Sequence, residues 1–353
     1  MISLNNRVQA FAKLGKLLTE VGNNNIQAEN EVGKLHKLNQ AVLDAVNYNG
    51  WFIEENVRYM LASIGESLAV GNLEKWLEPY RNELDKNKKV SVVGVVMAGN
   101  IPIVGFHDFL SILITGNKIL AKLSSGDNKI LPIIADLLTE IEPGFEDMIE
   151  FTNHRLIGFD AIIATGSNNT SRYFEYYFGK YPNIIRKNRS GIALLTGNET
   201  DEELQNLSKD IYMYYGLGCR NVSHIMIPEG YDINNMLHIF SLNEEVANNH
   251  KYFNNYEYNK AIYLVNGKKH FDTGNLLLTE DSSYSSPVSV IHLSYYNDVS
   301  LVGNILKANS TDIQCVVTLS DAVANAVIPG ESQSPQLWDY ADGIDTMQFL
   351  INL

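Results

Sequence analysis

The sequence predicts an α/β protein with two parallel-sheet lobes. From residue 90 onward, short runs rich in Val, Ile and Ala alternate with segments of helical length, which is typical of βαβ units. The alternation starts again near residue 191, and 353 residues are enough to bury two cores. We therefore expect four regions: helices over 1–89 that pack on the first lobe, a first lobe over 90–190, a second lobe over 191–328, and a tail over 329–353 that returns to the first lobe.

The first region has apolar residues at helix-face spacing. Val8, Phe11, Leu14 and Leu18 would lie on one side of a helix that ends at the asparagines 23–25. Further amphipathic helices are expected up to a polar break at 85–89.

The first lobe opens with a β-branched run over 90–96, which indicates a strand buried on both faces. Further strands are expected over 118–123 and 161–165, and helices over 106–115, 130–141 and 171–178.

The second lobe begins with an apolar strand over 192–195 and a helix over 201–215. Residues 222–227 suit either a helix or a strand. Residues 313–319 read as a buried strand with Cys315 in the core, and the apolar run 347–351 is a candidate terminal strand.

Composition excludes several classes of protein. With 27 Lys plus Arg against 41 Asp plus Glu, the net charge of −14 argues against a nucleic-acid partner. No run approaches the ~18 apolar residues of a membrane span, and the first residues lack a signal-peptide pattern. Two cysteines cannot form a disulfide framework, so we expect a cytoplasmic location.

Cys219 directly follows a Gly-x-Gly bend at 216–218. Such a bend can present a thiol to a cleft, and backbone N–H groups or a helix N-terminus would stabilise its reactive thiolate. The alternative is a buried small hydrophobe, the commoner fate of a lone cysteine. His224 lies five residues later and would not share a helical face with Cys219, so this spacing does not support a Cys–His pair.

Asn100 lies just after the first buried strand. Open parallel sheets bind ligands beyond the carboxyl ends of their strands, and an amide there can donate to a developing oxyanion. The alternative is a plain turn, because Gly99-Asn100 and Pro102 are turn-forming residues.

Two other strand ends carry candidate binding residues. Lys122 and Ser124 follow the second strand and suit a ribose or its phosphate, although a solvated lysine is the commoner case. Gly166 and Ser167 link the third strand to a helix, where free N–H groups favour a phosphate. The alternative there is a helix N-cap by Asn or Thr.

The order of these segments is more specific than any one of them. Along the chain the order is Gly99-Asn100 with Pro102, then Lys122 with Ser124, Thr165-Gly166-Ser167, Ser190-Gly191 and Gly218-Cys219. This order resembles the aldehyde dehydrogenase superfamily, and within it the acyl-CoA reductases of bacterial luminescence operons. The resemblance covers roughly residues 90–330. It implies an aldehyde-dehydrogenase-like fold, with a nucleotide-binding first lobe and a catalytic second lobe.

The resemblance also implies roles for individual residues. Cys219 would be the nucleophile, and Asn100 would donate to the oxyanion together with the backbone N–H of Cys219. Lys122 would bind the adenosine ribose, with Ser124 near a 2′-phosphate. Gly166 and Ser167 would support the pyrophosphate and the nicotinamide side.

For ligands, the resemblance favours NADP (as NADPH) over NAD and implies no metal. The expected substrate is acyl-CoA or another acyl thioester. A homo-oligomer and an acyl-transferring protein partner are further expectations.

Two departures from the superfamily bear on the reaction. Hydrolytic members carry a glutamate that activates water, but residues 188–192 read Asn-Arg-Ser-Gly-Ile. The acid that usually precedes the segment matching 286–288 is also missing, which leaves the nicotinamide-ribose contact unassigned. The first loss suits an enzyme that reduces acyl thioesters to aldehydes. The alternatives are a CoA-acylating aldehyde dehydrogenase or a glutamyl-phosphate-type reductase on a short acid, and a non-catalytic protein of this fold.

Overall fold

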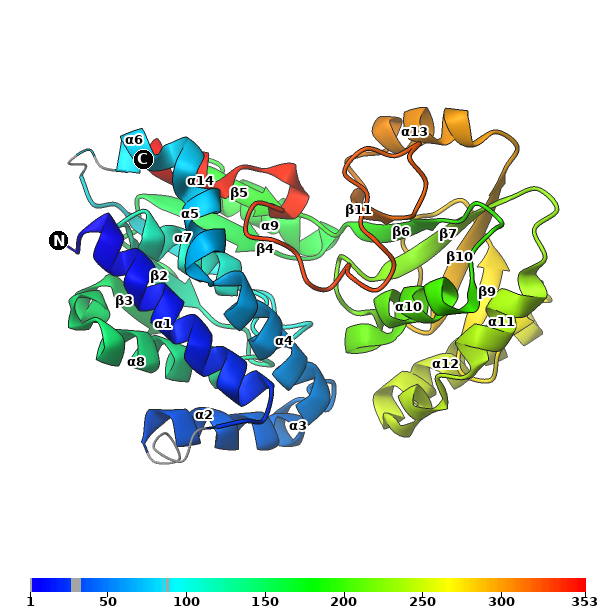
Figure 1. Ribbon diagram of the computed structural model, residues 1–353, viewed down its shortest axis with the longest axis horizontal. Helices are drawn as coiled ribbons and strands as arrows, with labels where there is room; N and C mark the ends of the chain where they lie inside the picture. Colours follow the sequence, from blue (N-terminus) through cyan, green and yellow to red (C-terminus); the bar gives the residue numbers. More distant parts are fainter. Residues whose placement is uncertain (1, 27–32, 85, 87–88) are drawn as a thin grey trace. The chain divides into compact units, whose positions relative to one another are not determined.

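The computed structural model describes residues 2–26, 33–84, 86 and 89–353. The chain forms two compact units: unit 1 comprises residues 1–187 and 336–353, and unit 2 comprises residues 188–335 (Figure 1). Both are α/β structures with largely parallel sheets, which confirms the predicted fold class. The expected polar break at 85–89 lies partly outside the described residues.

Unit 1 contains a five-stranded parallel sheet in the order β3-β2-β1-β4-β5. The strands are β1 Val92–Val96, β2 Lys118–Lys122, β3 Ile149–Thr152, β4 Ala161–Thr165 and β5 Asn183–Arg186. The sequence pattern predicted β1, β2 and β4 but not β3 or β5. Both missed strands have four residues and lie at the sheet edges, where polar side chains interrupt the apolar pattern.

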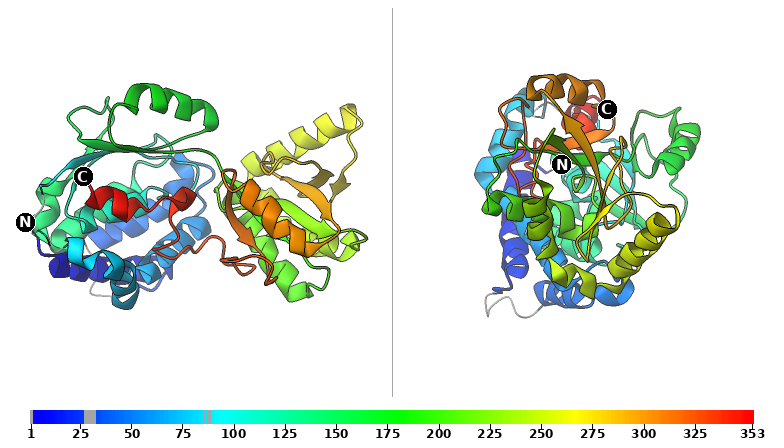
Figure 2. Two further views of the ribbon diagram at one scale, coloured as in Figure 1. Left: turned by 90° about the horizontal axis from the view of Figure 1, so that it is seen from above. Right: turned by 90° about the vertical axis from the view of Figure 1, so that its right-hand side faces the viewer.

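Helices cover both faces of this sheet. The helices of unit 1 are α1 Leu4–Gly22, α2 Lys34–Leu43, α3 Ala45–Tyr48, α4 Glu54–Ser67, α5 Val70–Leu77, α6 Arg81–Leu84, α7 Phe106–Ile114, α8 Ile130–Ile141, α9 Asn168–Phe178 and α14 Thr346–Ile351. From β1 the chain builds outward in one direction through α7 and α8, and from β4 in the other direction through α9. Because such crossovers are right-handed, α9 lies on the opposite face from the other helices (Figure 2).

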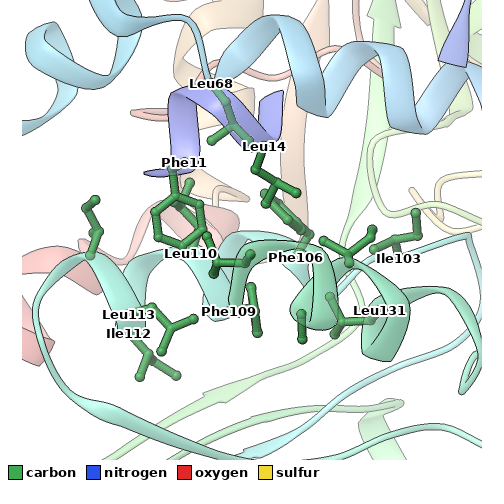
Figure 3. Close-up of a cluster of buried hydrophobic side chains, with 14 of the residues drawn as sticks. Phe11, Leu14, Leu68, Ile103, Phe106, Phe109, Leu110, Ile112, Leu113 and Leu131 are labelled. Carbon is green, nitrogen blue, oxygen red and sulfur yellow. The ribbon is translucent and has the colours of Figure 1, made fainter. Parts of the chain in front are cut away.

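The main core of unit 1 lies on the face covered by α7 and α8. Helix α7 is apolar nearly all round, because it packs between the sheet and the outer helices. Its side chains meet Phe11 and Leu14 of α1 and Leu68, which follows α4 (Figure 3). Ile103, in the loop before α7, points into the same cluster.

The tail over 336–353 packs within unit 1, and its last element is a helix rather than the expected strand. Asp345 caps α14 by accepting a hydrogen bond from the Gln348 N–H at 2.8 Å. Met347, Leu350 and Ile351 then fall on one buried face, a periodicity that the short apolar run did not resolve.

A buried ion pair supports this docking. Both guanidinium Nη groups of Arg186 donate to Asp108, at 2.6 and 2.8 Å, and one also donates to the hydroxyl of Thr346. The pair therefore joins β5, α7 and α14.

Unit 2 contains a six-stranded sheet in the order β11-β6-β7-β10-β9-β8, in which only the β8–β9 pair is antiparallel among the described residues. The strands are β6 Ser190–Leu194, β7 Val222–Pro228, β8 Phe271–Asp272, β9 Leu277–Glu280, β10 Val290–Tyr296 and β11 Ile313–Val317. The helices are α10 Asp201–Tyr212, α11 Ile233–Ser241, α12 His250–Val265 and α13 Val299–Ala308. Residues 222–228 are thus a strand.

Cys315 is half-buried rather than a core residue. Its strand, β11, lies at the edge of the sheet, and only the two end residues of the strand are fully buried. The expectation of a core cysteine was therefore wrong, because an apolar strand pattern does not distinguish an edge strand from a central one. Within the described residues, no helix has both the length and the apolarity that crossing a bilayer requires.

Candidate functional site

The sheet of unit 1 has a topological switch point between β1 and β4. Crossovers run away from these two strands in opposite directions, which leaves a crevice at their carboxyl ends in open α/β sheets. The loop after β1 carries Asn100, and the loop after β4 carries Gly166 and Ser167. Val96 pairs with Ala164 across the two strands, so the two loops leave the sheet side by side.

Lys122 reaches the same edge from the neighbouring strand. It is the last residue of β2 and pairs with Val96 of β1 on one side and with Thr152 of β3 on the other. The structure therefore brings the predicted residues of unit 1 to one edge of one sheet.

A cavity of about 640 Å³ opens at this edge, on the face that α9 covers. Its lining comes from the ends of β1 and β2, the loop after β3, and α9 with the residues that follow it. The lining residues are Val96, Lys122, Asn153, His154, Arg155, Leu156, Ile157, Gly158, Phe159, Phe174, Tyr177, Phe178, Lys180 and Tyr181. The buried cluster on this side of the sheet is small, with Leu120, Leu156 and Ile162 at its centre. Because few apolar side chains pack on this side of the sheet, there is room for a ligand.

The charge of the cavity is opposite to that of the whole chain. Lys122, His154, Arg155 and Lys180 line it, and its lining contains no Asp or Glu. No ion pair joins Lys122 or Arg155 to any other described residue. In a protein of net charge −14, this concentration of positive charge beside aromatic walls favours an anionic ligand with a flat apolar part.

The two predicted serines do not line the cavity, and their hydroxyls already have partners. The Ser124 hydroxyl accepts a hydrogen bond from the Gly126 N–H at 3.3 Å. Ser167 is the N-cap of α9 and accepts from the Thr170 N–H at 3.2 Å. The cap is thus made by a serine, where Asn or Thr was the expected alternative. The cofactor contacts of both serines stay predictions.

Glycines allow close packing of these loops. A Cβ at Gly99 would lie 2.3 Å from the Ser124 hydroxyl oxygen, and one at Gly166 would lie 2.9 Å from the ring of Phe174. A side chain at either position would force these neighbours to shift, which favours glycine. Asn100 is exposed in the bend that follows Gly99.

In unit 2, Cys219 is exposed in a turn directly before β7. Before the turn, Tyr214, Tyr215 and Gly216 have consecutive positive φ angles of 52°, 59° and 74°. Left-handed backbone is unfavourable for a tyrosine, and both rings are buried, so the surrounding core imposes this bend. No helix begins at Cys219, so of the two expected sources of thiolate stabilisation only backbone N–H groups remain.

Asn221 fixes the turn from inside. Its side-chain carbonyl accepts from the Gly218 N–H at 2.8 Å, and its amide donates to the carbonyls of Asp210 and Met213 at 2.9 and 2.8 Å. Asn221 is buried. These bonds join the end of α10 to the residues on both sides of Cys219, so the thiol is presented by a preformed loop.

The segment that lacks the hydrolytic glutamate lies next to this turn. Gly191 of β6 pairs with Val222 of β7, and a Cβ at Gly191 would lie 2.6 Å from the carbonyl oxygens of Arg220 and Asn221. On the other side of β7, residues 286–289 precede β10, and the Ser223 hydroxyl donates to the Tyr284 carbonyl at 2.7 Å. Residues 188–191 and 284–289 therefore border the Cys219 turn.

Two titratable groups near this turn have structural roles. Asp210 is fully buried and accepts from the N–H groups of Gly330 and Ser332, and burial raises its pKa. His224 is buried in β7, with Nδ1 donating to the Ser283 carbonyl and Nε2 accepting from the Ser294 hydroxyl. Burial lowers the pKa of His224, which keeps it neutral. Neither group is free to act as a base.

Several residues that shape these two sites were not predicted from the sequence. Arg155, His154 and Lys180 were not among the predicted site residues. His154 and Arg155 follow the end of β3, but their position beyond a strand could be recognised only if β3 itself was predicted. Asn221 lies only two residues after Cys219, but its side-chain hydrogen bonds are evident only in the folded turn.

Comparisons with known proteins add the fold family. No protein-family model matches the chain, and no curated protein matches it. Among solved structures, aldehyde dehydrogenase 21 from Physcomitrella patens, in complex with succinate, superimposes with a TM-score of 0.68 at 12% identity, covering 100% of this chain and 84% of that one. This chain has the aldehyde dehydrogenase fold.

Other neighbours agree. A putative methylmalonate-semialdehyde dehydrogenase from Sinorhizobium meliloti 1021, complexed with NAD, has a TM-score of 0.59 at 12% identity and covers 89% of this chain and 73% of that one. The aldehyde dehydrogenase KauB from Pseudomonas aeruginosa has a TM-score of 0.58 at 13% identity and covers 94% and 74%. At these identities the likeness concerns the fold.

Proposed function

We propose that this protein reduces acyl thioesters, fatty acyl-CoA among them, to aldehydes with NADPH, through an acyl-enzyme on Cys219. The observation that carries the proposal is the exposed thiol in a preformed turn, bordered by a segment without a carboxylate. The aldehyde dehydrogenase fold and the likeness to the acyl-CoA reductases of luminescence operons support it.

Cys219 would act as a thiolate. Its sulfur attacks the thioester carbonyl, the carbon–sulfur bond to CoA breaks, and CoA leaves as a thiolate that takes up a proton. The carbonyl oxygen becomes negative in the tetrahedral intermediate. We assign its stabilisation to the Asn100 amide and the Cys219 N–H, and one such donor contributes about 3–4 kcal/mol in hydrolases.

The cavity beside Lys122 fits the adenosine half of a nicotinamide dinucleotide. Phe174, Phe178 and Tyr181 offer aromatic walls to a base, and Lys122 offers an ammonium to the ribose. When bound, the reduced nicotinamide would supply a hydride to the acyl carbon; the bond from that carbon to the Cys219 sulfur would then break, which releases the aldehyde and returns the thiolate. The S. meliloti neighbour complexed with NAD supports a nicotinamide cofactor. The additional basic groups lead us to propose NADP rather than NAD.

Replacing Arg155 with alanine should lower the preference for NADPH over NADH about tenfold, because a charge-assisted bond to the 2′-phosphate is lost. Titration calorimetry of both cofactors measures this. Arg172→Ala is the matched control, since Arg172 is exposed on α9 and does not line the cavity. An unchanged ratio in Arg155→Ala would rule out this role.

The acyl-enzyme should react with thiols and resist water. Residues 187–192 contain no Asp or Glu that could act as a general base for water. With fatty aldehyde and NADP⁺, we expect acyl-CoA in the presence of CoA and little free acid in its absence. Free acid formed at a comparable rate without CoA contradicts the prediction.

The proposed function as a whole is tested by following NADPH and NADH oxidation with acyl-CoA substrates of varied chain length. A preference for long chains supports a fatty acyl-CoA reductase, and a preference for short chains supports a CoA-acylating enzyme of the same fold. No oxidation with any of them would refute the proposal.

A further inference from the structure

The loop that carries Asn100 contains a strained residue. Ile103 has a positive φ of 54° and is 2% exposed. Left-handed backbone is unusual for any residue with a Cβ and a clear outlier for a β-branched one. The side chain of Ile103 lies in the apolar cluster of unit 1 (Figure 3), and apolar packing does not by itself account for a left-handed backbone. Something else must hold this conformation.

A buried carboxylate contacts the strained residue. Asp127 is 6% exposed, and its Oδ2 accepts a hydrogen bond from the Ile103 N–H at 2.6 Å. Its other oxygen, Oδ1, is buried without a hydrogen-bond partner among the described residues. An acid is costly to bury in this way for packing alone. The hydrogen bond from the Ile103 N–H is the interaction that accounts for the burial of Asp127.

Asp127 belongs to the turn that continues from Lys122. The Asp127 N–H donates to the Ser124 carbonyl at 3.0 Å, which closes the turn. Ser124 in turn packs on Gly99, directly before Asn100. The Asn49 side chain donates to the Gly126 carbonyl at 3.0 Å and ties the turn to the residues after α3. The turn after β2 and the loop after β1 thus touch at both ends, at Gly99 and at Ile103.

We infer that Asp127 is a positioning residue that joins the Lys122–Ser124 turn to the Asn100 loop and keeps both in one arrangement. The link between the two loops is supported by the contacts at Gly99 and Ile103. Only its consequence for turnover rests on the proposed function, through the roles given to Asn100 and Lys122.

Titration of Asp127 makes the link measurable. Burial raises the pKa of Asp127 to about 7, against the opposing effect of the Ile103 N–H bond. Among the described residues, Tyr48 of α3 is the titratable group coupled to Asp127: its pKa is raised by burial first, then by the charges of Asp127 and Asp44. The ionised carboxylate accepts the Ile103 N–H more strongly than the neutral acid does. The loop should therefore be held more firmly above pH 7.

Stability should change in the opposite direction. Because the folded pKa lies above the ordinary value of 3.8, the contribution of Asp127 to folding is fully present below that value and is lost as the pH rises through about 7. Stability should therefore fall as the pH rises from 3.8 to about 7, and the firmer positioning of the loop should appear at the upper end of that range and above it.

The decisive experiment is a pH titration of the Ile103 backbone amide by ¹⁵N NMR, from about pH 5.5 to about 8.5, around the region where Asp127 titrates. We expect a midpoint near 7 in the wild type and no such titration in Asp127→Asn, which keeps an acceptor oxygen but cannot ionise. Asp136→Asn, on the exposed side of α8, is the control and should titrate like the wild type. A wild-type Ile103 amide that does not titrate, or one that titrates equally in Asp127→Asn, would overturn the inference.

Kinetics test the consequence. Asp127→Ala should lower kcat and raise the KM for the cofactor, each roughly tenfold at most, because one buried hydrogen bond is lost. A fall in kcat alone would show that the two loops are not joined through Asp127. If Asp127→Ala fails to fold, the amide titration of Asp127→Asn decides. An Ile103 amide that titrates as expected in a protein without reductase activity supports the link and refutes only the proposed function.

Discussion

Cys219→Ala abolishes acyl-enzyme formation, whereas Cys315→Ala leaves it intact: this is the largest effect that we expect. Cys219 is exposed in a turn that Asn221 and the bend at 214–216 hold in place. Cys315 is half-buried on β11, and its thiol donates weakly to the Arg220 carbonyl at 3.7 Å. A thiol that is half-buried and directed to a carbonyl is poorly placed to attack a substrate.

The measurement is the intact mass of the protein after incubation with acyl-CoA and an acid quench. Wild type and Cys315→Ala should gain the mass of one acyl group, and hydroxylamine should remove it. Alkylation by iodoacetamide gives a second readout, in which Cys219 should react faster. Equal acylation of Cys219→Ala would mean that the nucleophile lies elsewhere.

Asn100→Ala should lower turnover by about 10²–10³-fold, or about 2.7–4 kcal/mol, with little change in cofactor affinity. An amide that donates to a developing oxyanion stabilises the transition state and does not contribute to binding of the cofactor. Since the neighbouring Gly99 and Ile103 anchor the loop, removal of the exposed Asn100 side chain should leave its path unchanged.

Steady-state turnover and calorimetric NADPH binding check this together. Asn82→Ala, exposed on α6, is the control for loss of a surface amide. A decrease below about tenfold, well under the range for an oxyanion donor, would leave Asn100 as a turn residue only.

The elements with the clearest patterns were predicted well. The helix Ile130–Ile141 and the strand Ala161–Thr165 have the bounds that the sequence indicated, because the helix has apolar residues at helix-face spacing and the strand is a short apolar run. The same reasoning gave a wrong prediction for the run 347–351, which was expected to be a strand and is a helix. A few apolar residues suit a helix or a strand equally, and the cap by Asp345 together with packing on α7 decides between them.

The candidate site was predictable to the extent that one rule applies to it. Ligands lie beyond the carboxyl ends of parallel strands, and this rule selected Asn100, Lys122 and Gly166 without knowledge of the strand order. Arg155 and Lys180 depend on β3 and on the folding of α9 over the sheet, which are tertiary facts. The sequence alone indicates that Asp127 is an ordinary acidic loop residue. Its burial and its hydrogen bond from Ile103, which are seen only in the structure, indicate a positioning role.

The return of the tail to unit 1 has a consequence for the order of folding. The Trp76 indole donates to the Tyr340 hydroxyl across a sequence separation of 264 residues. The hydrogen bond from Arg186 to Thr346 likewise cannot form until the tail has been synthesised. During synthesis, unit 2 is complete while α7 still lacks its contacts with α14. The part of α7 that packs on α14 therefore stays uncovered throughout the synthesis of unit 2, and closing so long a loop costs entropy before these contacts offset it. Synthesis of unit 1 starts before that of unit 2 and ends after it. Unit 1 is therefore the part of the molecule that stays incomplete longest, and incomplete units with exposed apolar surface are prone to aggregation.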